Sequence, residues 1–400
     1  MKYEKLTLTL IFIFLFFAFL LKPLLRSKDH FLIDFKVYHH TATEILKGNS
    51  NIYETAYDPK MKFKYAPIWG IFFIPFALFS FHTASLIWLA FTSLIFIFTF
   101  YLCRRLFLRY EIALHPLFYI LGIIFWYGPL RKVFGLGQVD ILLTCILLAA
   151  FYVSQKKQNT LSALLWALCI SLKLPAAIFM LLYLWKKEFK LVFGVLLFGF
   201  GVNFLAALSF NPSDPFEVFR HWFFLLGASG QALMIDLQNQ SLLTLFIRYF
   251  SNQDPFHIHI LSLPRTLLLW MYALVCFSLF GFCFLNLKKI PKNVQDLYLF
   301  NALCIFMILL NPNVWRANYI ALMPVILFVL SQIKQRFYLF WLLLLLNIFT
   351  HSGAWKIIGF ETLHGTKHLH LLFMIWPMEA LVLFFLMIRL FPIQRPKLSL

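Results

Sequence analysis

The sequence is short of charged residues, which make up only 13% of the chain. Soluble globular proteins place charged residues at about 25% of their positions. Hydrophobic residues fill 62% of the chain, compared with about 45–50% in a typical soluble domain. A soluble chain of this length could not bury so many apolar side chains in its core, whereas in a membrane protein such side chains also contact lipid. The composition therefore excludes an ordinary soluble protein and predicts an all-α polytopic membrane protein.

Signatures of several enzyme classes are also missing. No G-x-S-x-G elbow, Walker loop or Rossmann fingerprint occurs in a fitting context. No separate soluble domain is visible, although a nucleotide-sugar enzyme would be expected to use one. The six cysteines show no C-x-x-C spacing and lie in or beside apolar segments, so we expect small buried side chains.

The sequence gives little support for nucleic acid or metal as a partner. Basic residues outnumber acidic ones by 35 to 16, but they form short clusters between apolar runs, which fits a lipid bilayer better than nucleic acid. His364, His368 and His370 form an H-x3-H-x-H pattern. Apart from the nearby Glu361, no acid or cysteine completes a convincing ligand set, so we expect no metal and no cofactor.

Apolar runs predict about twelve membrane spans, several of them shorter than the ~20 residues that a straight crossing needs. They cover residues 6–25, 83–103, 112–128, 139–154, 161–173, 175–186, 191–209, 265–287, 296–311, 315–333, 337–350 and 371–390. The pair around LKLP (172–175) is typical of broken helices, and the proline-containing run 65–79 is expected to be an interfacial or dipping helix.

Charge between the spans predicts the orientation. If the N-terminus is cytoplasmic, the basic pairs at 104–105, 156–157, 186–187 and 288–289 all fall on the cytoplasmic side, as membrane insertion favours. The lysine-bearing loop 26–64 argues against this orientation, but the other short loops outweigh it. The longer polar loops 26–64, 129–138, 210–264, 311–316 and 351–370 then share the extracytoplasmic side, and both termini are cytoplasmic. An enzyme working at one face of the inner (plasma) membrane would need such asymmetry.

The first of these loops contains an isolated carboxylate. From Phe35 the apolar positions 35, 38, 42, 45 and 46 lie on one helical face, and Gly48 is a natural stop. These features predict an amphipathic helix lying on the membrane. Asp34 stands where an N-cap would stand. It is either a cap alone or a general base at the lipid–water boundary.

Several short motifs occur in a particular order along the chain. They are D-x3-Y (34–38), Gly48, N-x-Y (51–53), Y-x-P (65–67), G-Q (137–138), Lys173 before Pro175, N-Q-S (239–241) followed by Arg248, and N-P-x-x-W (311–315). Together they resemble glycosyltransferase family 87, the membrane mannosyltransferases that use polyprenyl-phosphate-linked sugars. Each motif alone is weak, but the order covers roughly residues 1–335.

The resemblance implies a single GT-C-type transmembrane domain over residues 1–400, with a catalytic first extracytoplasmic loop at 26–64. It implies that Asp34 deprotonates an acceptor hydroxyl, which attacks the anomeric carbon of the sugar with inversion while lipid phosphate leaves. The implied partners are a polyprenyl-phosphate sugar donor, with mannose as the expected sugar, and a glycolipid or cell-envelope glycan acceptor.

A leaving phosphate needs cations, and the sequence offers five candidates. They are Lys173, Arg248, Arg131, Lys132 and Arg316. Lys173 lies in an otherwise apolar stretch, where a lysine costs about 2.5–3.5 kcal/mol on insertion scales. It is either a snorkelling lysine near a helix end or an anchor for the lipid phosphate. Arg131 and Lys132 could instead be an interfacial pair.

Four polar residues are candidates for contact with sugar or acceptor: Tyr38, His39, Asn239 and Gln240. The two amides could equally satisfy the backbone of a turn, and Asp140 is expected to cap the span that it begins. The chain departs from the family pattern at YAP (65–67), where Y-P-P is frequent, and at Asn318, where histidine is frequent. The alternatives to an enzyme are a lipid-linked sugar flippase or transporter, or a non-catalytic membrane assembly subunit.

Overall fold

The structure is a computed structural model. It describes residues 32–54, 61–112, 114, 116–232, 235–253, 258–332, 341, 344–345, 347–349, 371 and 374–391. This described part is helical and contains no β-strand. The chain divides into two compact units, one formed by Met1–Leu106 and Pro129–Gln231 and the other by Phe107–Gly128 and Ala232–Leu400.

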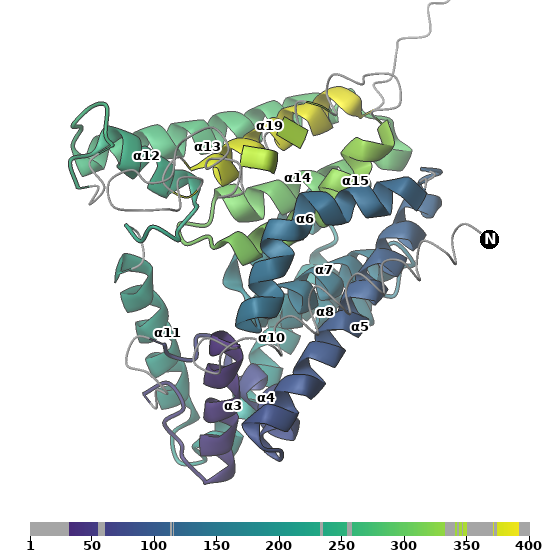
Figure 1. The fold of residues 1–400 in the computed structure, drawn as a ribbon. Coiled ribbons are helices and arrows are strands. Elements are labelled where there is room, and N and C mark those ends of the chain that lie inside the picture. Colours follow the sequence, from purple (N-terminus) through teal and green to yellow (C-terminus); the bar gives the residue numbers. More distant parts are fainter. Residues whose placement is uncertain are drawn as a thin grey trace, which may run out of the picture. The chain divides into compact units, whose positions relative to one another are not determined.

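The first unit contains the helices that carry the N-terminal motifs (Figure 1). They are α3 (Ile33–Leu46), α4 (Pro67–Ala77), most of α5 (Phe81–Arg109), the end of α6 (Pro116–Leu136), α7 (Asp140–Ser154), α8 (Asn159–Leu172), η3 (Leu174–Phe179), α9 (Met180–Trp185), α10 (Phe189–Phe210) and nearly all of α11 (Pro215–Ala232). Helix α8 packs between α7 and α10, and α4 packs on both α3 and α10. Apolar side chains of α7 and α8 are buried at these contacts and form much of the core.

The second unit is built around one almost completely buried helix. Its elements are the end of α5, most of α6, α12 (Leu242–Phe250), α13 (Arg265–Leu287), η4 (Lys292–Val294), α14 (Gln295–Leu309), η5 (Arg316–Leu322), α15 (Met323–Gln332) and α19 (Ile375–Leu390). Helix α14 is buried at every position from 297 to 309 and contacts α13, α15 and α19. A helix that is apolar all round can be surrounded by protein, as α14 is, or by lipid.

The structure confirms the all-helical membrane class but not the number of spans. Among the described residues, three helices are long and apolar enough to cross a membrane, namely α5, α10 and α13. Helices α6 and α7 would qualify together as a fourth span, but the chain bends by 116° between them. The predicted span 6–25 lies outside the described residues, as does most of 337–350. The count of twelve is therefore not confirmed.

Two segments expected to be loops contain helices. Residues 215–232 form α11 and residues 242–250 form α12, both within the long segment 210–264. Residues 129–136, expected to begin the loop 129–138, continue α6 instead. Proline is tolerated inside apolar helices when neighbouring groups satisfy the backbone that it frees, which explains why Pro129 does not end α6.

Candidate functional site

Asp34 is not the N-cap of its helix. Helix α3 begins at Ile33, the N-cap is Leu32 in the left-handed region (φ 50°), and no side chain makes a capping hydrogen bond. The amide of Leu32 donates to the carbonyl oxygen of Gly135 at 3.3 Å, which ties this start to the end of α6. Asp34 is therefore the second residue of the helix, and its carboxylate is directed to another partner. The alternative in which Asp34 is only a cap is wrong.

The rest of α3 confirms the predicted helix, but the helix packs on protein where lipid was expected. Phe35, Tyr38 and Ala42 are buried, and α3 packs on α4. The apolar face expected to lie on lipid is thus covered by protein along much of its length. The helix ends at Leu46, and Gly48 has φ +80°, the left-handed conformation that commonly follows a helix end.

Gly137 allows α3 to approach the turn between α6 and α7. Its φ is +73°, and a Cβ added there would lie 2.6 Å from the Cβ of Phe35. The indole N–H of Trp88 donates to the Gly137 carbonyl oxygen at 3.1 Å, while the Trp88 ring stacks on Phe35 with centroids 5.2 Å apart. Only glycine satisfies both the backbone angle and the close contact. This approach places the next residue, Gln138, beside Asp34.

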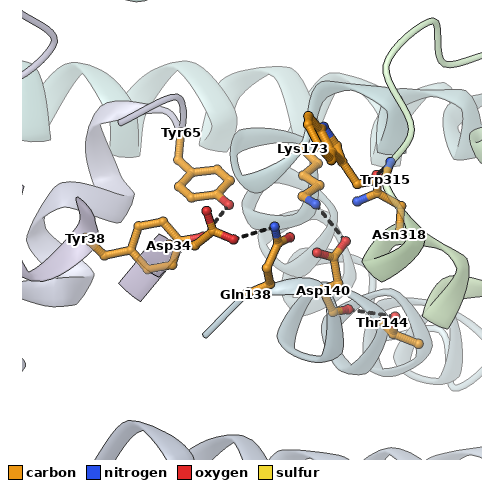
Figure 2. A network of polar contacts seen from close by, with 9 residues as sticks. All are labelled: Asp34, Tyr38, Tyr65, Gln138, Asp140, Thr144, Lys173, Trp315 and Asn318. Atoms are coloured by element: carbon orange, nitrogen blue, oxygen red, sulfur yellow. Dashed lines mark hydrogen bonds and ion pairs between the residues drawn. The ribbon is translucent and has the colours of Figure 1, made fainter. Parts of the chain in front are cut away.

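Polar side chains gather around Asp34 in two hydrogen-bonded groups (Figure 2). The Gln138 side-chain amide donates to Asp34 Oδ2 at 2.6 Å. The hydroxyls of Tyr38 and Tyr65 share a hydrogen bond of 2.8 Å, and Tyr53 donates to the carbonyl oxygen of Tyr65 at 2.9 Å. The three motif tyrosines are thus joined to one another beside the carboxylate.

Burial determines the electrostatics of this cluster. It raises the pKa of Asp34 to about 6, while the Gln138 hydrogen bond and the charge of Lys173 act in the opposite direction. Burial also raises the pKa of Tyr38 and Tyr65, so both hydroxyls remain protonated near neutral pH. A carboxylate with a pKa near 6 is ionised at neutral pH and still basic enough to accept a proton, as a general base requires.

Lys173 forms an ion pair that the sequence reasoning did not predict. Its ammonium lies 2.6 Å from Asp140 Oδ1, and the side chains are 20% and 2% exposed respectively (Figure 2). Asp140 is the first residue of α7, and the N-cap is Val139, so the expected cap at Asp140 is wrong. Helix α8 ends at Leu172, and the chain continues through η3 and α9, which confirms the broken helices expected around LKLP.

Asn203 was missed by sequence reasoning. It lies in α10, and its side chain donates to Ser171 Oγ at 2.7 Å and accepts from the amide of Ile68 at 3.2 Å. It therefore links the start of α4 to the end of α8, the elements that follow Tyr65 and precede Lys173. The available signal was a lone amide within an apolar helix, because polar side chains at such positions join helices by hydrogen bonds.

Three further candidates, Arg131, Lys132 and His39, also lie in the first unit. Arg131 is exposed and Lys132 half-buried on the last turns of α6 rather than in a loop. His39 Nε2 lies 3.0 Å from the carbonyl oxygen of Phe79, which follows α4. Their roles in binding phosphate or acceptor stay predictions.

The second unit shows what Asn239 and Gln240 contact. Asn239 Oδ1 accepts from the backbone amides of Ser241 and Val314, at 3.0 and 3.1 Å. The Gln240 backbone amide donates to the Val314 carbonyl oxygen at 2.6 Å, and its side chain donates to that of Leu371 at 3.0 Å. These bonds confirm the alternative in which both residues satisfy turn backbone, and they join N-Q-S to N-P-x-x-W. The side-chain oxygen of Gln240 is buried and has no hydrogen-bond partner among the described residues.

The two arginines of the second unit differ in burial. Arg248 is 1% exposed, and its guanidinium donates to the carbonyl oxygens of Leu371 and Asp236. Arg316 is half-buried at the start of η5, where the Asn318 side chain accepts from the Trp315 amide at 2.7 Å. Asn318 thus acts as a cap at the position where the family often has histidine. Phosphate binding by either arginine stays a prediction, and 364–370 lies outside the described residues.

Comparison with known proteins gives one match. The sequence model of glycosyltransferase family 87 matches residues 63–312, which is more than half of the chain. The matched range contains Gln138, Lys173 and Arg248, whereas Asp34 precedes it. No curated protein and no solved structure matches. The length of the family match shows that the chain belongs to glycosyltransferase family 87, a family of membrane glycosyltransferases.

Proposed function

We propose that this glycosyltransferase moves a hexose, with mannose as the expected sugar, from a polyprenyl-phosphate donor to a hydroxyl of a glycolipid or cell-envelope glycan. One observation carries the proposal beyond the family. Asp34 is held by Gln138 at 2.6 Å in a crowded site where its pKa is about 6. This is the protonation behaviour that a base needs to activate a sugar hydroxyl.

The proposed reaction is a single displacement. The acceptor O–H gives its proton to Asp34, and the acceptor oxygen forms a bond to the anomeric carbon. The bond from that carbon to the phosphate oxygen breaks, and its electron pair leaves with the lipid phosphate. Attack from the face opposite the leaving group inverts the configuration. Tyr38 and His39 lie about one turn after Asp34 on α3 and are proposed to contact the acceptor or sugar. Asn239 and Gln240 are the corresponding candidates in the second unit.

Cations are proposed to bind the donor phosphate. In the first unit these are Lys173, which lies close enough to lower the pKa of Asp34, and the α6 residues Arg131 and Lys132. Arg248 and Arg316 are the candidates in the second unit. We propose no metal or other cofactor, because the carboxylate and the cations account for proton transfer and charge.

The proposed site faces the extracytoplasmic side of the inner membrane, with both termini cytoplasmic. The test uses sealed membrane vesicles of known orientation, a radiolabelled polyprenyl-phosphate mannose and a panel of membrane-impermeant acceptors. Labelled product should form only when the acceptor is added to the extracytoplasmic face. Movement of the labelled lipid between leaflets without any transfer would instead indicate a flippase and contradict the proposal.

The pH dependence of transfer should report the ionisation of Asp34. With a pKa of about 6, about nine tenths of the carboxyl is ionised at pH 7 and about one tenth at pH 5. The transfer rate should therefore fall about tenfold for each pH unit well below 6. Gln138→Met removes a hydrogen bond that lowers this pKa, so its acidic limb should lie at higher pH.

Initial rates measured from pH 4.5 to 8 check this expectation. Gln158→Met is the matched control, because Gln158 is exposed before α8 and makes no side-chain capping bond. Its pH profile should coincide with that of the wild type. Coincidence of the Gln138→Met and wild-type profiles would show that the Gln138 bond does not tune the base.

A further inference from the structure

The charges around Asp34 are unequally compensated. The ionisable groups that affect its pKa through charge are Lys173, Asp140 and Lys64. Lys173 and Asp140 form a buried pair at 2.6 Å, so their charges largely cancel at a distance. Lys64 is the remaining cation of this set, and its charge and that of Asp34 stabilise each other. The sequence reasoning did not single out Lys64.

Lys64 is held in place but its ammonium has no acidic partner among the described residues. The carbonyl oxygen of Lys64 accepts from the indole of Trp222 at 3.0 Å, and that of Tyr65 accepts from Tyr53. Phe63, on the other side, is 1% exposed. The backbone is therefore fixed on both sides. No described carboxylate lies within 4.0 Å of the Lys64 ammonium.

Partial burial makes such a cation a favourable place for an anion. Lys64 is half-buried, and burial lowers the pKa of its ammonium. An ammonium that has lost part of its water gains more from a bound anion than a fully solvated one does. We propose that Lys64 binds the phosphate of the lipid-linked donor beside Asp34 and receives the negative charge as that phosphate leaves. This inference rests on the proposed function and assigns the phosphate subsite of the same centre.

The charge balance of the reaction supports this assignment. Before transfer, Asp34 and the phosphodiester of the donor each carry one negative charge. After transfer, Asp34 is neutral and the phosphate monoester carries two, so one negative charge has moved from the carboxylate to the phosphate. A cation that interacts with Asp34 and is not neutralised by a neighbouring carboxylate can stabilise the negative charge both on Asp34 and, after transfer, on the phosphate. Lys173 is restrained by its bond to Asp140.

The first test measures binding of polyprenyl phosphate and of the matching polyprenol, which lacks phosphate, in vesicles of zwitterionic lipid. Lys64→Met should weaken binding of the phosphate lipid by about ten- to a hundredfold and leave polyprenol binding unchanged. Lys64→Arg, which keeps the charge, should bind at close to the wild-type level. Lys62→Met is the matched control, because Lys62 lies two residues away and is not among the charges that affect Asp34. Competition by an anionic bilayer lipid tests whether the site accepts any lipid headgroup phosphate.

The second test uses transfer kinetics. Lys64→Met should raise the KM for the donor about tenfold or more, and its acidic limb should move to higher pH because a charge that lowers the pKa of Asp34 is gone. If the wild type transfers sugar while Lys64→Met keeps the wild-type phosphate-lipid affinity and pH profile, this inference is wrong and the proposed function stands. If the wild type transfers no sugar from any polyprenyl-phosphate donor, the proposed function itself fails. Equal loss of polyprenol and phosphate-lipid binding would show a structural role only and would also overturn the inference.

Discussion

An Asp34→Asn variant should fold as the wild type does and lose sugar transfer by a factor of about 10²–10⁴. Asparagine keeps the size of the side chain and an oxygen that can accept the Gln138 hydrogen bond. It cannot accept a proton from the acceptor hydroxyl. Because Asp34 makes no capping bond at the start of α3, the change leaves the helix end intact. Initial transfer rates and thermal unfolding of the purified variant in detergent measure the two halves of this prediction.

Glu44→Gln is the matched control for Asp34. Glu44 is on the same helix, but it lies away from the cluster and pairs with Lys47 at 2.8 Å on the exposed side. Exposed pairs of this kind contribute about 0–1 kcal/mol, so the control should keep both its stability and its activity. Near-normal transfer by Asp34→Asn would leave Asp34 without a catalytic role, whatever the family match.

The fold class was predictable because it follows from composition and periodicity. Apolar runs located most helices of both units, and Gly48 and Pro175 marked a helix end and a broken segment. The helix 215–232 was missed because its apolar residues are interrupted by charged and polar ones, and the span boundary predicted at residue 128 falls inside α6. In both cases the local sequence pattern was misleading, because tertiary packing, which cannot be read from one sequence, determines where these helices form and end.

The site was predictable only in part. The aspartate and lysine were found because isolated charges in apolar surroundings are unusual. Their partners were not assigned. Gln138 is 104 residues from Asp34 in sequence, and no periodicity relates them. The pairing of Asp140 with Lys173 was within reach, because α7 and α8 are consecutive packed helices, and the start of the first lies near the end of the second.

Lys173→Met should cause the largest loss of stability, about 3–5 kcal/mol. The change removes the ion-pair partner of Asp140, whose side chain is 2% exposed inside the first unit. It should also raise the pKa of Asp34, because Lys173 lowers it through charge, and so move the acidic limb of transfer to higher pH. Thermal unfolding in detergent and the pH profile of transfer provide the two measurements.

A second variant separates the ion pair from the packing around it. In Lys173→Met/Asp140→Leu both charges are gone, and apolar groups replace a buried pair, which is often neutral or stabilising. The double variant should therefore regain much of the stability that Lys173→Met loses. Lys186→Met is the control, because its pair with Glu188 is about one third exposed and should contribute about 1 kcal/mol or less.

Activity of the double variant then distinguishes two roles of Lys173. If Lys173 only neutralises Asp140, removing both charges should restore transfer together with stability. If it also binds the donor phosphate, stability should return while the KM for the donor stays high. The second outcome is expected if Lys173 has the phosphate role proposed above, because the charge that would contact the donor is still missing in the double variant. A Lys173→Met variant as stable as the wild type would contradict the buried ion pair itself.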